Sequence, residues 1–344
     1  MKSYKLIKKK KIQEITGKLL KNKPDEIISK VIYTGICGSD LSVYLGKHPY
    51  KKAPVVLGHE FLGKVQKKGA KIKNLKENDL ITSLPYNYCG KCMYCKKGLT
   101  NHCNNKTTPS YKKWDGTFAE YFLSKKNSTY KLNKKINLLD GVMMEPFAIS
   151  NHALNLILDK KLKNSLILGA GNTGLATLML AKNNKHFKRI GIVDIHSSRN
   201  KIVKELGANY FIKYNSKNFI KKTTQKTQKE GVDVIFITCD YKNVINDAIN
   251  IINPKGTIII ISYFKDSFNI DYNLIVKKEI VIKGSFLSTI KDFKEVEKMI
   301  LGKKLKPRKI ISDIYPLQRI KYAFDQMHNH RNNNLKIILK NEKQ

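Results

Sequence analysis

The chain has 344 residues, of which 41% are hydrophobic, and its formal net charge is +39. This length allows two domains with separate cores, and the hydrophobic content excludes a disordered chain. No apolar run approaches the roughly 20 residues of a membrane-spanning helix. The lysine-rich N-terminus lacks the apolar segment of a signal peptide, so we expect a cytoplasmic protein.

Lysine carries almost all of the positive charge. Only five of the 66 basic residues are arginines, and the lysines are spread over nearly every segment. A nucleic-acid-binding face would cluster its cations and use arginine for forked phosphate contacts. We therefore expect solvated basic surfaces with weak adhesion to polyanions, and neither a specific nucleic-acid partner nor a membrane partner.

Short apolar runs, interrupted by Gly, Pro and Asn, extend from Lys5 to about Ser83. This pattern is typical of short strands joined by frequent turns, and it predicts a small β-barrel.

Within this region a thiol and an imidazole lie in one short stretch. Cys37 stands between glycines, which let the backbone turn tightly, and His59 follows an apolar run. A lone cysteine or histidine is more often a packed core residue. Here the carboxylates of Asp40 and Glu60 can hold the imidazole ring by its second nitrogen. Sulfur and nitrogen are zinc ligands, and a catalytic zinc has three protein ligands and one open position.

The sequence Cys-Gly-Ser-Asp at residues 37–40, followed by Gly-His-Glu-Phe-Leu-Gly at 58–63, resembles the zinc-dependent medium-chain dehydrogenase/reductase family. This family includes the alcohol and polyol dehydrogenases. The resemblance implies a GroES-like catalytic domain over residues 1–150. It also implies that Ser39 occupies the family's proton-relay position, from which a hydroxyl passes the substrate proton outward.

Four cysteines follow within fifteen residues, at Cys89, Cys92, Cys95 and Cys103. Four thiolates at this spacing can close a tetrahedron around one zinc and leave no open position, which predicts a structural site. The family's structural zinc lobe has the same pattern. A redox dithiol is the alternative, but no strand-to-helix setting precedes these cysteines. We expect His102 to lie at the surface.

The segment Trp114–Tyr121 is predicted as a strand and resembles the family's Gly-Gly-Phe-Ala-Glu-Tyr element. Beyond it, Glu145 is followed by proline. Alcohol dehydrogenases of the family commonly have a cysteine at this place, whereas polyol dehydrogenases have this Glu-Pro pair. The resemblance therefore implies Glu145 as the third zinc ligand, directly or through a water, with Glu60 as a competitor. Local sequence also fits a carboxylate at a helix start, and His152 is expected to be structural.

A second domain is predicted over residues 151–286, with a dinucleotide-binding turn. After a strand at 165–168, the turn contains Gly169, Gly171, Asn172, Thr173 and Gly174. The glycines permit a tight turn and close approach of the pyrophosphate, and the following helix N-terminus attracts phosphates.

The next predicted strand ends at Asp194, twenty residues after the last glycine of the turn. Its carboxylate would accept hydrogen bonds from the ribose hydroxyls and repel a 2′-phosphate, which favours NAD over NADP. Arg199 and His196 lie close by in sequence and could bind a 2′-phosphate, so NADP is the alternative cofactor. Further strands and helices alternate to Gly284, which predicts a six-stranded doubly wound sheet. Residues 287–344 are expected to return to the catalytic domain.

These features predict a zinc-dependent, NAD-linked enzyme that interconverts a secondary alcohol, a polyol or sugar alcohol, and a ketone, with two zinc ions per chain. Compared with sorbitol dehydrogenases, Val43 and Leu287 replace a tyrosine and an arginine, which argues against plain sorbitol. Lys47, Lys51 and Lys52 fit a phosphorylated polyol. An L-threonine dehydrogenase-like enzyme and a catalytically silent NAD-binding sensor are alternatives. The resemblance implies a homodimer or homotetramer.

Overall fold

The computed structural model describes residues 1–157, 162–215, 217–264, 267, 269–330 and 334–342. It divides into two compact units, Met1–Ala148 with Leu287–Gln344 and Ile149–Phe286. The N-terminal segment of the first unit ends at Ala148, two residues before the domain boundary that the sequence predicts at 150. Among the described helices, none is both long and apolar enough to cross a membrane.

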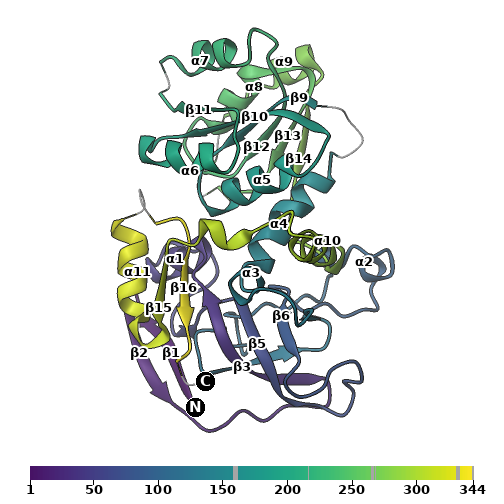
Figure 1. Cartoon of the computed structure of the whole chain (residues 1–344), viewed down its shortest axis with the longest axis vertical. Helices are drawn as coiled ribbons and strands as arrows, with labels where there is room; N and C mark the ends of the chain where they lie inside the picture. The colour runs from purple at the N-terminus through teal and green to yellow at the C-terminus, as the bar shows by residue number, and fades with distance from the viewer. Residues whose placement is uncertain (158–161, 216, 265–266, 268, 331–333, 343–344) are drawn as a thin grey trace. The chain divides into compact units, whose positions relative to one another are not determined.

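The first unit is built on a seven-stranded sheet with the order β15-β16-β3-β5-β6-β8, and β7 pairs with β3 outside this path. Figure 1 shows β3, β5 and β6 side by side. All the pairings are antiparallel except that between β15 and β16. The strands are β3 (Glu26–Gly35), β5 (Glu60–Lys68), β6 (Leu80–Ser83), β7 (Tyr121–Lys125), β8 (Thr129–Lys131), β15 (Asp313–Pro316) and β16 (Ile337–Lys340).

Eight of the ten residues of β3 are buried, because sheet pairing and core packing cover both of its faces. Its last residue, Gly35, pairs with Glu60 at the start of β5. The strand therefore delivers the chain to Cys37 directly beside the start of β5 and the preceding His59. A smaller antiparallel sheet has the order β2-β1-β4, with β1 at Lys2–Lys8, β2 at Lys11–Thr16 and β4 at Val55–Val56.

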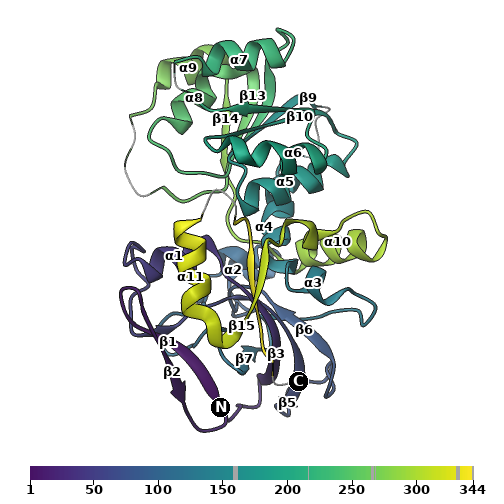
Figure 2. The same cartoon turned by 60° about the vertical axis from the view of Figure 1, so that its left-hand side comes forward.

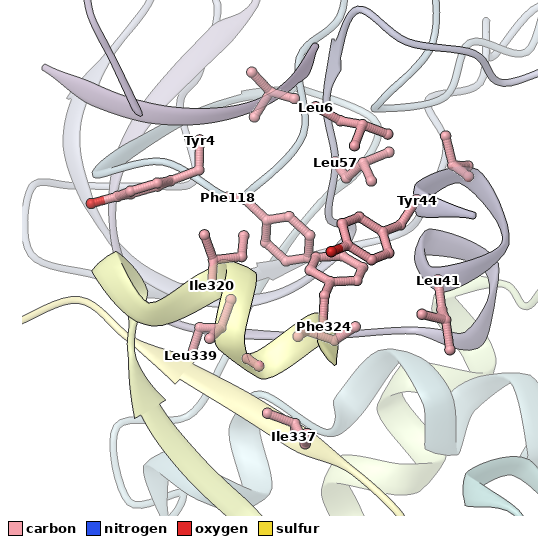
Figure 3. Packing of buried hydrophobic residues seen from close by; sticks show 14 of the residues in the cluster. Tyr4, Leu6, Leu41, Tyr44, Leu57, Phe118, Ile320, Phe324, Ile337 and Leu339 are labelled. Atoms are coloured by element: carbon pink, nitrogen blue, oxygen red, sulfur yellow. The ribbon is translucent and has the colours of Figure 1, made fainter. Parts of the chain in front are cut away.

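Helix α1 (Gly38–Tyr44) packs on the C-terminal part of the chain through an aromatic core. Figure 3 shows the rings of Tyr44, Phe118 and Phe324 gathered there. Tyr44 stacks on Phe324 with ring centroids 4.7 Å apart, and Phe118 meets Phe324 edge-on at 5.8 Å. Phe324 belongs to helix α11 (Ile320–Asn329). The C-terminal segment thus fixes the helix whose N-cap is Cys37.

The segment Trp114–Tyr121 is not the strand that its sequence predicts; β7 begins only at Tyr121. The chain instead crosses the end of β4 in an irregular path, in which Gly116 N donates to Val56 O and Thr117 N donates to Gly58 O. A Cβ at Gly116 would lie 2.3 Å from Leu57 O. This close approach of two backbones prevents regular pairing and requires glycine.

The second unit contains one six-stranded parallel sheet with the order β11-β10-β9-β12-β13-β14. Its strands are β9 (Leu162–Leu168), β10 (Phe187–Asp194), β11 (Tyr210–Lys213), β12 (Val232–Ile237), β13 (Ile252–Ile260) and β14 (Val281–Gly284). The doubly wound sheet predicted from the sequence is confirmed.

Helices cover both faces of this sheet (Figure 2). One face carries α5 (Asn172–Lys182) and α6 (Asn200–Glu205), and the other carries α7 (Phe219–Lys226), α8 (Val244–Ile251) and α9 (Tyr272–Lys278). The strand order reverses between β9 and β12. In such sheets ligands bind at the carboxyl ends of the strands beside this reversal, where Gly169 and Thr238 lie.

Candidate functional site

Cys37, His59 and Glu60 form a compact group in the first unit. One potential ligand atom from each lies within 4.8 Å of the others, so the three could hold a metal ion. Cys37 is the N-cap of α1, and His59 and Glu60 stand at the start of β5. His59 and Glu60 are buried, and Cys37 is partly exposed. The Cys37 side of the group is therefore in contact with solvent.

Asp40 links the two segments that carry Cys37 and His59. Its Oδ2 accepts from Cys37 N at 3.1 Å, and its Oδ1 accepts from Gly58 N at 3.3 Å. Oδ1 also lies 3.5 Å from Nδ1 of His59, which has no hydrogen-bond partner of good geometry among the described residues. This distance is suited to an electrostatic pair that orients the ring, so Nε2 is the nitrogen available for a metal.

The ionisation of Asp40 and His59 reflects this pairing. Burial raises the pKa of the Asp40 carboxyl, but the charge and hydrogen bond of His59, the charge of Lys51 and the backbone N–H of Cys37 together outweigh it, so the net shift is downward. Burial lowers the pKa of His59, but the charges of Asp40 and Cys37 raise it well above its ordinary value. A carboxylate beside the imidazole therefore keeps the ring strongly basic, which strengthens it as a ligand.

Glu60 is engaged by a lysine from the far end of the chain. Lys336 Nζ lies 2.7 Å and 2.6 Å from the two carboxylate oxygens of Glu60, and it also donates to Ile36 O at 3.1 Å. Both side chains are 1% exposed. A Cβ at Gly35 would lie 2.1 Å from Glu60 Oε2, so glycine is needed there. The sequence analysis missed Lys336, which is 276 residues away from Glu60.

Glu145 lies in helix α4 (Met144–Asn155) and is buried. It does not complete a group with Cys37 and His59 among the described residues, although the charges of His59 and Glu60 act on it. Burial raises the pKa of Glu145 to about 7, with the His59 charge opposing and the Glu60 charge adding to this rise. The carboxylate would become fully ionised if a further positive charge were placed nearby.

These acidic groups fit a divalent cation. The Cys37 thiol and the carboxyl groups of Asp40, Glu60 and Glu145 interact electrostatically with the side chains of His59, Lys336 and Lys51. Burying unbalanced anions is costly unless they are paired or bind a metal. Sulfur, nitrogen and oxygen ligands in one group are typical of a catalytic zinc.

The four predicted structural ligands also come together. The sulfur atoms of Cys89, Cys92, Cys95 and Cys103 lie within 4.8 Å of one another, and none of these cysteines forms a disulfide. Backbone N–H groups of Lys91 and Cys92 lower the pKa of Cys89 to about 6, which favours the thiolate. Four sulfurs without an open position fit a structural zinc. His102 is exposed.

In the second unit the glycine turn joins β9 to α5. Gly169 has φ +106°, and a Cβ at Gly174 would lie 1.8 Å from Gly169 O. Gly171 is the N-cap of α5, and a Cβ built there meets nothing within 4 Å. Two glycines are therefore required by the turn itself, and the third leaves open space at the helix N-terminus. That arrangement fits a pyrophosphate, with Asn172 and Thr173 in the first turn of the helix.

Asp194 ends β10, and its carboxylate already accepts three hydrogen bonds. Oδ2 accepts from Ala170 N at 2.7 Å and from Arg199 at 3.0 Å, and Oδ1 accepts from His196 N at 2.8 Å. The carboxylate thus ties β10 to the glycine turn. Arg199 places a positive charge beside the position that the sequence analysis assigned to the ribose.

The comparisons with known proteins agree with this geometry. The alcohol dehydrogenase GroES-like domain matches residues 23–134, and the zinc-binding dehydrogenase domain matches residues 173–302. D-arabitol-phosphate dehydrogenase of Enterococcus avium is 29% identical over 318 residues, covering 92% of this chain and 90% of that protein. Sorbitol dehydrogenase of Halalkalibacterium halodurans is 28% identical over 297 residues, covering 86% of each.

Among solved structures, a short-chain alcohol dehydrogenase of Escherichia coli CFT073 in complex with NADH superposes with a TM-score of 0.91. It is 25% identical and covers 99% of each chain. The two matched domains together span more than half of the chain. The chain therefore belongs to the zinc-dependent medium-chain dehydrogenase/reductase family, and it is a zinc-type alcohol or polyol oxidoreductase.

Proposed function

We propose that the protein uses zinc and NAD to interconvert a polyol, free or phosphorylated, and the corresponding ketone by acting on a secondary hydroxyl group. The observation that carries this proposal is the group of Cys37, His59 and Glu60 beside a buried Glu145. The relatives named as D-arabitol-phosphate and sorbitol dehydrogenases support a polyol as the substrate.

Cys37 and His59 would hold the catalytic zinc together with one carboxylate. A zinc ion there supplies Lewis-acid chemistry, which makes the substrate hydroxyl acidic near neutral pH. We assign the third ligand to Glu145, directly or through a water, because both oxygens of Glu60 already bind Lys336. Asp40 keeps the His59 ring oriented. A second zinc would be held by the four cysteines at 89–103.

The hydroxyl proton needs a path away from the buried site. Ser39 is exposed in the first turn of α1, two residues after Cys37. Its hydroxyl can accept a proton from the substrate and donate one to solvent. A bound nicotinamide cofactor would supply the hydride-transfer chemistry. We assign NAD because a 2′-phosphate would meet the Asp194 carboxylate, whose charge the ion pair with Arg199 offsets in part.

The test is NADH formation by the purified protein with free and phosphorylated polyols and with L-threonine, in the presence of zinc or of a chelator. We expect turnover of polyols that the chelator abolishes. Cys37→Ala and His59→Ala should each lower kcat by at least about a thousandfold, since each removes a metal ligand, while NAD binding is unchanged. The matched control is Cys239→Ala, which removes a partly buried thiol of the second unit.

Normal turnover by Cys37→Ala or His59→Ala would contradict the zinc mechanism. Oxidation of L-threonine in preference to every polyol would show that the substrate is an amino acid and not a polyol. Binding of NAD and two zinc ions without turnover of any alcohol would favour the alternative that the protein is a catalytically silent NAD-binding sensor.

A further inference from the structure

The segment between α1 and β4 contains a turn organised by a histidine. His48 Nδ1 accepts from the backbone N–H of Lys51 at 3.1 Å and from that of Tyr50 at 3.4 Å. Acceptance at Nδ1 requires the ring proton to be on Nε2. Burial and the charge of Lys51 lower the pKa of His48, which keeps this neutral form. The turn therefore fixes the backbone from which the Lys51 side chain extends.

The Lys51 ammonium is partly buried and contacts the segment that lies against Gly58, the residue before His59, because Ser110 Oγ donates to Gly58 O at 3.3 Å. Its Nζ donates to Pro109 O at 3.0 Å. Its charge helps to lower the pKa of Asp40, and the charges of Asp40 and Cys37 act on it in return. Burial nevertheless lowers the pKa of Lys51. Hydrogen bonds through Pro109 and Ser110 thus connect the ammonium to the backbone beside His59.

The Lys51 ammonium has more N–H donors than its hydrogen bond to Pro109 uses. A lysine offers three N–H groups, and one of them is used by Pro109. Within the part of the chain that the structure describes, no carboxylate lies within 4.0 Å of Lys51 Nζ. Lys336, the other cation near the site, is by contrast saturated by Glu60 and Ile36. A partly desolvated cation without an anion beside it is a binding site for an anionic group.

The neighbouring residues distinguish Lys51 from the other lysines of the segment. Lys47 and Lys52 are exposed, so solvent screens their charges. The Tyr50 ring packs edge-on against His48 at 4.6 Å and against Tyr111 at 6.2 Å, and Tyr50 is 58% exposed. These rings form a rigid surface next to Lys51 on which the C–H groups of a ligand can pack.

We propose that Lys51 binds the phosphate group of a phosphorylated polyol substrate. This inference rests on the proposed function, because it places the reacting hydroxyl at the zinc site and the phosphate ester further along the same carbon chain. A charge-assisted N–H···O bond to a phosphate is about twice as strong as a neutral one. The resulting preference for a phosphate ester is therefore a property of this one side chain.

The experiment compares kcat/KM for matched pairs of substrates, such as D-arabitol and its phosphate esters or galactitol and galactitol 1-phosphate. The sugar acid D-gluconate serves as a carboxylate probe. We expect the zinc-loaded enzyme to favour phosphate esters. In Lys51→Met the ratio of kcat/KM between ester and free polyol should fall at least tenfold, mainly through KM. Lys51→Arg should keep most of the ratio, and the exposed control Lys52→Met should keep all of it.

A binding measurement separates this inference from the proposed function. The phosphate ester should raise the Tm of the zinc-loaded protein without NAD, and it should not raise that of Lys51→Met. Binding of the ester without oxidation of any alcohol would remove the proposed function and leave the Lys51 assignment standing. Oxidation of polyols with an unchanged ratio in Lys51→Met, or a preference for free polyols or D-gluconate, would overturn the assignment.

Discussion

At the scale of single residues, the buried ion pair of Glu60 and Lys336 shows how a distant segment of the chain stabilises the site. Burying two charges is costly, and their mutual attraction with good hydrogen bonds offsets this cost. Lys336 meets both requirements, since it contacts both oxygens of Glu60 and the carbonyl of Ile36. The pair thus gives the Glu60 carboxylate a buried counter-charge from the protein itself.

Removing one member of this pair should therefore be more harmful than removing both. We expect Lys336→Met to lower the free energy of unfolding by about 3–5 kcal/mol, because it leaves Glu60 buried without a counter-charge. Lys336→Met combined with Glu60→Gln should recover part of this loss. Urea unfolding of the four proteins in a double-mutant cycle measures the coupling. Additive losses in the double variant would show that the ion pair does not stabilise the fold.

The residue scale is also where sequence reasoning is weakest. The sequence analysis named Cys37, His59, Glu60 and Glu145 from their residue types and neighbours. It had no means of finding Lys336, because one lysine among 61 carries no signal and its partner is 276 residues away. A contact of that range follows from the return of the C-terminal segment to the first unit, and not from any local pattern.

At the scale of elements, buried parallel strands were predicted well because continuous apolar runs between helices identify them. The Trp114–Tyr121 segment was predicted wrongly as a strand. Its residues alternate as a strand would, but the crossing of backbones at Gly116 and Leu57 determines its path. A helix at 38–44 was not predicted either; the signal available was Asp40, which completes a capping box with Cys37.

The turn between β9 and α5 offers a matched pair of substitutions within one element. Gly174→Ala should lower the free energy of unfolding by about 3 kcal/mol, because its Cβ would lie 1.8 Å from a backbone oxygen. Gly171→Ala should leave the stability unchanged, because its Cβ meets nothing. It should weaken NAD binding about tenfold, which is about 1.4 kcal/mol, by filling the space of the pyrophosphate.

Thermal unfolding without cofactor and titration with NAD measure the two effects separately. Equal stability of the two variants would contradict the packing argument for Gly174. Unchanged NAD affinity in Gly171→Ala would mean that the pyrophosphate does not approach this turn.

At the scale of the whole molecule, charge and function are separate properties. The charge of +39 is carried by 61 lysines and five arginines spread along the chain. The proposed function instead uses two cations held by hydrogen bonds, Lys336, which is buried, and Lys51, which is partly buried. Net charge is an argument about solubility and nonspecific adhesion rather than about a site.

The proposed function assigns NAD to the second unit and zinc to the first, so each ligand should stabilise its own unit. NAD at a hundred times its Kd should add about 2.7 kcal/mol to the unit that binds it. We expect hydrogen exchange to slow most around the 169–174 turn when NAD is added. Removal of zinc by a chelator should speed exchange most in the four-cysteine segment 89–103, since the four sulfurs would lose the ion that holds them together.

Cys92→Ser is the control for this experiment, because it weakens the four-cysteine site without changing the glycine turn. It should reproduce the faster exchange of 89–103 in the presence of zinc and leave the protection by NAD intact. Faster exchange of the 169–174 turn to the same extent as that of 89–103 would contradict separate stabilisation. The metal would then support the whole molecule, and loss of activity on chelation could no longer be attributed to the catalytic ion alone.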